Sequence, residues 1–405
     1  MVKRGQCSFC GSKKQIVLGV NGCICRECAE VATKSFGIEY VKTQATGKKA
    51  FNYSPVEMKK MLDEEIVGQD SAKEILSVAV CNHMRRIQSG NTFIKKANIL
   101  LMGPTGCGKT FLMSKIAEIL DAPMVVVDAT GFTKVGYVGQ DASSALARLY
   151  MSSGNNIEKC QKGIIYIDEI DKLAMSSSQD PRDPGGMGVQ QNLLKLMEGG
   201  IQSFKLDPMS PEISIDTTNI LFVFGGAFVG LGDKSNVKKE VGFASSTVAN
   251  KSNESHDPSH DELTKYGLIP EFVGRVPVIV NMNELSKENL KSIMCETNSS
   301  VVKQYKAMFE LSGIEVEFDN GLIDAIVDEA IKKKTGARGL RGVMEKDVMK
   351  IMFEADKHKK IKKIYIDRDL LDHPERILEK SELASAEEVK ARMDSAKIKH
   401  AAVAG

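Results

Sequence analysis

Apolar residues recur at helical spacing over residues 70–89, the first long periodic segment of the chain. The positions that share this spacing are Ala72, Ile75, Leu76, Ala79, Val80, Met84 and Ile87. Steps of three and four residues bring these side chains to one face of an α-helix, and Asp70 is a residue type that caps helix N-termini. The pattern therefore predicts an amphipathic helix over residues 70–89.

Further along, short apolar runs alternate with helical patterns. The runs cover residues 98–102, 124–128, 163–168 and 219–224. Continuous apolar runs of this length are typical of strands that are buried on both faces, and strands separated by helices form parallel sheets. The sequence therefore predicts an α/β core in which a parallel sheet is flanked by helices.

After Pro277 the pattern becomes mainly helical, which predicts a second, smaller domain. Its helices are expected over residues 287–311, 321–334 and 339–356, and one short strand over 362–367. The last stretch, residues 379–405, is charged and rich in Ala, and it lacks the apolar spacing of a packed core.

A chain of 405 residues is longer than one hydrophobic core usually supports. Residues 41–54 are polar and rich in Gly, Lys and Thr, as flexible linkers are. The expected organisation is an N-terminal module over 1–40, a linker over 41–54, a large domain over 55–277, a small domain over 278–378 and a flexible tail over 379–405.

The composition of the chain restricts the classes of partner that are expected. Hydrophobic residues make up 42% and charged residues 27%, as in globular proteins, and the formal net charge is only +2. A nearly neutral chain offers no general electrostatic attraction for nucleic acid or for an anionic membrane, so neither is an expected partner. The N-terminus lacks the apolar run of a signal peptide, and no stretch reaches the ~18 apolar residues of a membrane span. We therefore expect a cytoplasmic protein.

Five of the nine cysteines lie in the first 28 residues. Cys7 and Cys10 form one CxxC pair, and Cys25 and Cys28 form a second. Two such pairs suit a tetrahedral zinc site, which stabilises a module too small to build a core. The alternatives are four free thiols or a redox pair. Cys23 competes as a ligand, but Cys25 is preferred because it completes the CxxC spacing.

A phosphate-binding loop follows the first predicted strand. Residues 103–110 read GPTGCGKT, and a helical segment comes next. In this strand–loop–helix context the backbone N–H groups and the helix N-terminus hold phosphates, Lys109 reaches the β and γ phosphates of ATP, and Thr110 holds Mg²⁺. The expected nucleotide-binding residues of this loop are Pro104, Thr105, Gly106, Cys107, Gly108, Lys109, Thr110 and Phe111.

Two acidic residues end the apolar run 163–168, which reads GIIYID and is followed by Glu169. A carboxylate at the end of a strand beside a phosphate-binding loop meets the metal ion, so Asp168 is assigned to Mg²⁺. Glu169 then orients and deprotonates the attacking water.

The order of these motifs closely resembles the ClpX family of AAA+ ATPases, in the Clp/Hsp100 group. The resemblance runs from residue 7 to about residue 370, through EIVGQ at 65–69, the phosphate-binding loop, IDEID at 167–171 and KTGARGLR at 334–341. It implies a homohexameric ring with a zinc-binding N-terminal module and large and small AAA+ domains. Such a ring uses ATP to pull unfolded or tagged proteins, in some cases with adaptors, through a central pore to the ClpP peptidase.

The resemblance also assigns roles residue by residue. It implies that Val67, Gly68 and Gln69 line the adenine pocket. Tyr137 and Val138, between two glycines, match the pore loop that grips substrate, and residues 176–188 match a second pore loop.

Two arginines match positions that act on the γ phosphate. Arg275 matches the arginine finger that reaches the neighbouring subunit's nucleotide, and Arg338 matches the sensor-2 arginine of the small domain. A guanidinium suits both roles because its charge is permanent and its donors are fixed in a fork.

A tripeptide in the long polar stretch 228–262 matches the motif that docks on ClpP. Val241, Gly242 and Phe243 stand where the family has Ile-Gly-Phe, and the missing methylene weakens each contact by about 1 kcal/mol. A second departure is the segment 201–213, which has one lysine where many family members carry a basic pore-entrance loop. Recognition of anionic C-terminal tags is therefore not carried over.

Three competing functions remain. A ring chaperone that remodels complexes without a peptidase shares every motif except ClpP docking. A nucleic-acid remodeller is disfavoured by the nearly neutral charge and by the lack of aromatic and basic stacking segments. HslU, a related protease motor, lacks the N-terminal zinc module and carries a large insertion, so the ClpX family is preferred.

Overall fold

The computed structural model describes residues 6–13, 16–18, 22–25, 27–29, 31, 53–91, 93–132, 143–174, 185–207, 210–231, 258–358 and 360–383. The chain divides into two compact units, Met1–Asn52 and Tyr53–Gly405. In the first unit β1 (Ile16–Leu18) pairs antiparallel with β2 (Cys23–Cys25), with Val17 opposite Ile24.

The second unit contains a five-stranded sheet in the order β4-β5-β8-β3-β9. All the pairings are parallel, and the strands are β3 (Ile99–Met102), β4 (Met124–Asp128), β5 (Ile164–Asp168), β8 (Leu221–Gly226) and β9 (Val278–Asn281). The predicted parallel α/β sheet is confirmed, and each predicted apolar run forms a strand. The sheet extends past residue 277, the expected end of the large domain, because β9 pairs with β3.

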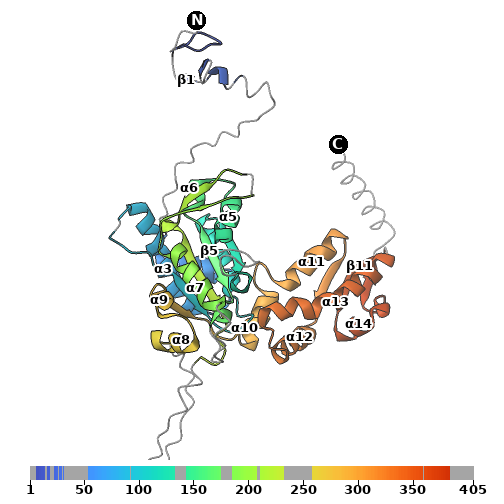
Figure 1. The fold of residues 1–405 in the computed structure, drawn as a ribbon. Helices are drawn as coiled ribbons and strands as arrows, with labels where there is room; N and C mark the ends of the chain where they lie inside the picture. The colour runs from blue at the N-terminus through green and yellow to red at the C-terminus, as the bar shows by residue number, and fades with distance from the viewer. Residues whose placement is uncertain are drawn as a thin grey trace, which may run out of the picture. The chain divides into compact units, whose positions relative to one another are not determined.

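Helices enclose this sheet, and α3, α5 and α7 are visible around β5 in Figure 1. The helices of this region are α2 (Pro55–Asp63), α3 (Asp70–Ser89), α4 (Lys109–Leu120), α5 (Ser143–Ser152), α6 (Ile157–Cys160), α7 (Gly185–Met197), α8 (His260–Tyr266) and α9 (Pro270–Val273). Helix α3 has the predicted bounds. Residues 185–188, expected in a loop, form the first turn of α7.

Three short 3-10 turns and one hairpin complete this region. The turns are η1 (Ala129–Gly131), η2 (Ile170–Leu173) and η3 (Thr217–Asn219), and β6 (Ile201–Phe204) pairs antiparallel with β7 (Ile213–Asp216). The core lies on the sheet, where Phe224 of β8 meets Phe272 of α9 edge to face at 4.8 Å between ring centroids.

A second hydrophobic core follows β9. It is built on α10 (Lys287–Cys295), α11 (Val301–Leu311), α12 (Asn320–Lys332), α13 (Gly336–Lys357), α14 (Arg368–Asp372), the turn η5 (Pro374–Arg376) and a sheet of β10 (Glu315–Phe318), β11 (Ile361–Ile366) and β12 (Ser381–Leu383). The smaller, mainly helical region is confirmed.

Two details of this region differ from the prediction. The expected helix over 287–311 is broken into α10 and α11, because the Ser300 side chain accepts a hydrogen bond from Lys303 N–H and caps a new helix. Three strands are present where one was expected, with β11 between the parallel β10 and the antiparallel β12. Of the helices in the described residues, none is both long enough and apolar enough to cross a membrane.

Candidate functional site

Four cysteine sulfurs gather in the first unit. The Sγ atoms of Cys7, Cys10, Cys25 and Cys28 all lie within 4.8 Å of one another. Tetrahedral zinc with Zn–S bonds of about 2.3 Å places its sulfurs about 3.8 Å apart, so the cluster fits this ion. Cys23 lies outside the cluster although it is buried, and its N–H donates to Ser8 Oγ at 2.9 Å.

The surroundings of Cys7 favour a thiolate. Burial raises the pKa of the Cys7 thiol, but hydrogen bonds from the backbone of Cys10 and Cys25 outweigh it and lower this pKa to about 6. The Cys25 N–H lies 3.2 Å from Cys7 Sγ. A deprotonated sulfur at neutral pH is the form that binds zinc.

The phosphate-binding loop connects β3 to α4 in the second unit. Gly103, Gly106 and Gly108 have φ values of 151°, 81° and 101°, which side chains rarely adopt. Lys109, the first residue of α4, is almost buried, and its Nζ donates to Gly103 O at 2.6 Å and to Pro104 O at 3.1 Å. The loop therefore presents its backbone and its lysine together at the carboxyl end of the sheet.

The end of β5 brings a carboxylate to the same place. Thr110 Oγ1 donates to Asp168 Oδ2 at 3.3 Å, and Tyr166 OH donates to Asp168 Oδ1 at 3.3 Å. Burial, and then the negative charge of Asp168, raise the pKa of Tyr166, which keeps its hydroxyl as a donor. A hydroxyl beside a carboxylate is a donor set that suits Mg²⁺.

Glu169 follows directly in a left-handed conformation, with φ 58°. Such backbone in a residue other than glycine is costly and is concentrated at functional sites. Its N–H donates to Asp168 Oδ1 at 3.0 Å, and its side chain is exposed at the pocket rather than packed in the core.

One cavity of about 440 Å³ collects most of these groups. The predicted residues that line it are Val67, Thr105, Gly106, Cys107, Gly108, Lys109, Thr110, Phe111, Asp168, Glu169 and Arg338. Leu285, Ile293 and Val301 of the second core also line it, together with Thr297. Their place in the site was not predicted, because nothing in their spacing signals a distant phosphate-binding loop. The cavity is therefore lined by residues of both the sheet-containing region and the mainly helical region.

Four predicted residues are placed outside the lining of this cavity: Gly68, Gln69, Pro104 and Arg275. The Gln69 amide instead forms a paired contact with the backbone of Asn283, donating to its O at 2.8 Å and accepting from its N at 2.9 Å. Arg275 forms an ion pair with Glu198 at 2.9 Å, and both side chains are about half exposed.

Several predicted residues lie outside the described residues, namely Tyr137, Val138, Val241, Gly242 and Phe243. Of the segment 201–213, residues 201–204 form β6 and Ile213 is the first residue of β7, while residues 208 and 209 lie outside the described residues.

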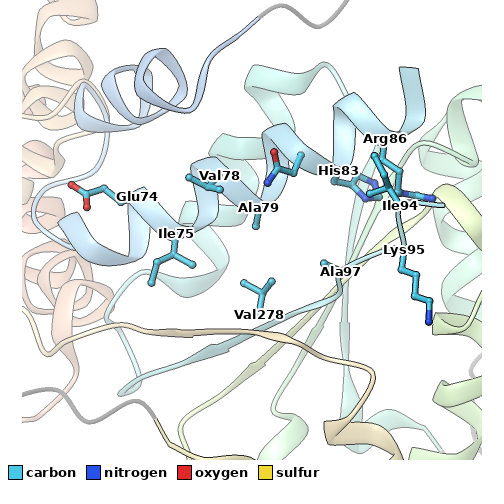
Figure 2. A pocket seen from close by; sticks show the side chains of 11 residues that line it. Glu74, Ile75, Val78, Ala79, His83, Arg86, Ile94, Lys95, Ala97 and Val278 are labelled. Atoms are coloured by element: carbon cyan, nitrogen blue, oxygen red, sulfur yellow. The ribbon is translucent and has the colours of Figure 1, made fainter. Parts of the chain in front are cut away.

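A second cavity of about 440 Å³ lies between α3 and the edge strand β9, and Figure 2 shows its mostly apolar lining of Ile75, Val78, Ala79 and Val278. At one end His83 Nε2 lies 3.2 Å from Asn219 O. Burial, and then the charge of Arg86, lower the pKa of His83 to about 3, so this imidazole is neutral at physiological pH. Neither the phosphate-binding loop nor Asp168 or Glu169 lines this cavity.

Comparison with known proteins agrees with this geometry. Residues 94–279 match the family described as the AAA domain (Cdc48 subfamily), and residues 285–365 match the C-terminal, D2-small domain, of ClpB protein. The first match contains the phosphate-binding loop and both acidic residues, so the chain is an AAA+ ATP hydrolase.

Full-length relatives carry the likeness across nearly the whole chain. The ATP-dependent Clp protease ATP-binding subunit ClpX of Treponema denticola is 39% identical over 388 residues, which is 90% of this chain and 93% of that protein. The same subunit of Bacteroides thetaiotaomicron is 39% identical over 405 residues, 94% of this chain and 97% of that one. That of Borrelia duttonii is 38% identical over 385 residues, 90% of each. Since the motifs, both cores and these relatives agree, this chain belongs to the ClpX family of AAA+ Clp ATPases.

Proposed function

We propose that the chain is the ATP-driven unfoldase of a Clp protease, which works as a ring of six copies and threads proteins through its pore to a ClpP peptidase. The observation that carries this proposal is the cavity lined by both the sheet-containing region and the mainly helical region, where Lys109, Asp168, Glu169 and Arg338 share one lining. A pocket of this kind changes shape when its nucleotide changes, and so converts hydrolysis into movement.

Hydrolysis is divided among the chain's own residues. Lys109 binds the β and γ phosphates, and Glu169 accepts a proton from the attacking water. Mg²⁺ would be held by Thr110 and Asp168, and when bound it neutralises charge on the phosphate oxygens. Arg338 binds the γ phosphate from the small domain, so loss of that phosphate releases the domain contact.

Arg275 completes the site of a neighbouring subunit. It does not line its own subunit's cavity, and its guanidinium is about half exposed on the surface, as a group that acts on a neighbour must be. The need for a neighbour explains why the active form is a ring.

Movement reaches the substrate through Tyr137 and Val138, and the peptidase is bound through Val241, Gly242 and Phe243. The four-cysteine module binds zinc and receives substrates or adaptors. The name of the relatives, which includes a Clp protease and its ATP-binding subunit, supports the assignment to a peptidase complex.

The experiment that tests this proposal measures the ATP-driven loss of fluorescence of a stable fluorescent protein fused to a panel of unstructured tails. We expect the parent chain to unfold at least one fusion and Glu169→Gln to unfold none. Addition of ClpP should then degrade the unfolded protein, and Phe243→Ala should abolish degradation without reducing ATP hydrolysis. Unfolding without any response to ClpP would favour a remodelling chaperone, and hydrolysis stimulated only by DNA or RNA would refute the protein-substrate assignment.

A further inference from the structure

Gln190 is a fully buried polar residue in the middle of α7, with an exposed fraction of 0%. A buried amide destabilises the fold unless its donors and acceptor are bonded. Every bond it makes here goes to the backbone of segments that flank proposed catalytic residues. Its position therefore bears on the chemistry and not only on packing.

The first bond holds the turn that begins at Glu169. Gln190 Nε2 donates to Leu173 O at 2.9 Å, and Leu173 is the last residue of η2, whose N-cap is Glu169. The approach of α7 to this turn is close, because a Cβ added at Gly186 would lie 2.5 Å from Leu173 O. The turn is thus supported from its far end by α7.

The other bonds hold the segment that leads to Arg275. Ile269 N donates to Gln190 Oε1 at 2.8 Å, and Gln190 Nε2 also donates to Gly267 O at 3.5 Å. Ile269 is the N-cap of the short helix α9, where it makes no side-chain capping bond, and Arg275 N–H donates to Phe272 O at the other end. The amide of Gln190 therefore fixes where α9 begins.

The direction of the amide is set by its partners. The carbonyl oxygens of Leu173 and Gly267 need a donor, which is the NH₂ group of Gln190, and the N–H of Ile269 needs an acceptor, which is the Gln190 side-chain oxygen. Only one orientation of the amide therefore satisfies all three partners. A carboxylate in the same place could accept from Ile269 N–H but could not donate to either carbonyl.

We propose that Gln190 is a positioning residue that holds the Glu169 turn and the Arg275 segment in a fixed relation on α7. The Glu169 turn acts on the subunit's own nucleotide, and the Arg275 segment acts on the nucleotide of the neighbouring subunit. One side chain therefore aligns residues of two nucleotide sites in the ring. This inference rests on the proposed roles of Glu169 and Arg275.

The first test is the kinetics of ATP hydrolysis by assembled rings. Gln190→Met keeps the length of the side chain and removes all three bonds, while Gln191→Met is the matched control because Gln191 is exposed on the same helix. We expect Gln190→Met to lower kcat about tenfold or more, since small misplacements of catalytic groups carry such costs, with KM for ATP changed less than about threefold. A kcat within about twofold of the parent in folded rings would overturn the inference.

Mixed rings separate the two halves of the proposal. Rings of Glu169→Gln and Arg275→Ala subunits should regain hydrolysis, because each variant supplies what its neighbour lacks. Gln190→Met subunits should not regain it with either partner, since their own site and their finger are both displaced. Recovery with either partner would overturn the coupling. Failure of the Glu169→Gln and Arg275→Ala mixture would instead refute the proposed roles of those residues.

Gln190→Glu keeps the proposal testable if Gln190→Met does not fold. The protonated acid can donate to Leu173 O and accept from Ile269 N–H, whereas the carboxylate cannot donate, and burial beside carbonyl oxygens raises the pKa of such an acid. Relative to the parent, kcat of this variant should therefore fall as the pH rises from about 6 to about 9. A constant ratio over this range would overturn the inference.

Discussion

Gly336→Ala should weaken nucleotide binding without unfolding either core. Gly336 begins α13 with φ 56°, and a Cβ there would lie 2.7 Å from Gly106 O in the phosphate-binding loop. Gly106 O also accepts a hydrogen bond from Ala337 N–H at 3.2 Å. The backbone of the small domain at Gly336 and Ala337, directly before Arg338, thus contacts the backbone of the phosphate-binding loop.

The magnitude follows from these contacts. A residue with a side chain in the left-handed region costs about 1–2 kcal/mol, and loss of the Ala337 hydrogen bond costs about 0.5–1.5 kcal/mol. Because both partners at the overlap are backbone, the strain is relieved only when α13 withdraws and takes Arg338 with it. Together these costs come to about 1.5–3.5 kcal/mol, which corresponds to an increase of about 10- to 300-fold in the Kd for ATP.

Isothermal titration with ATP in the presence of Mg²⁺ measures this effect, and thermal unfolding checks the cores. Gly342→Ala is the matched control, because Gly342 lies in the same helix with nothing within 4 Å of the added Cβ. Alanine there should leave affinity unchanged and stabilise the helix by about 0.5–1 kcal/mol. A Kd for Gly336→Ala within about threefold of the parent would refute the coupling of the small domain to the nucleotide.

Three further results are expected. Burial, and then the charge of Arg86, lower the pKa of Lys96 to about 7. Between about pH 7 and 10 this lysine is therefore protonated in the unfolded chain and neutral in the folded one, so the free energy of unfolding should rise with pH over that window. Urea titrations should show that Lys96→Met removes this rise. Glu198→Gln should change the unfolding temperature little, because exposed ion pairs contribute about 0–1 kcal/mol, yet it should raise ring ATPase by up to about fivefold as Arg275 becomes free to reach a neighbour. An unchanged ATPase rate would show that the pair does not restrain Arg275. Zinc chelation should unfold the four-cysteine module, seen as loss of amide dispersion in NMR spectra, while the ATPase unit keeps its unfolding temperature; retained dispersion would show that the fold around the four cysteines does not depend on a metal ion.

Local motifs were predictable because their chemistry is contiguous in the chain. The glycines at 103, 106 and 108 and the acids at 168 and 169 lie beside the strands that hold them, so strand pattern and chemistry appear together. The break after Cys295 was also signalled by the polar residues that end in Ser300, although residues 287–311 were predicted as one helix.

Contacts between distant segments were not predictable from the sequence. Gln190 reads as an ordinary helical polar residue until α7 is placed against η2 and α9, with partners 17 to 79 residues away. Gln69 was assigned to the adenine pocket by resemblance, and only the fold shows that its amide holds Asn283, 214 residues later. The spacing of residues along the chain does not indicate which distant residues will form such hydrogen bonds.

The contact between Gln69 and Asn283 marks the place where the sheet region ends and the second core begins. Met282 N–H donates to Met102 O at 2.7 Å, so the chain after β9 remains bound to the end of β3 up to this residue. The side-chain amide of Gln69 then binds both the N–H and the carbonyl of the next residue, Asn283. Leu285 already belongs to the second core. The rotation of the small domain that the proposed function requires would therefore occur within about two residues after Asn283. Because Arg338 and Leu285 both line the nucleotide cavity, even a small rotation there would change the cavity wall while the sheet that carries Asp168 stays intact.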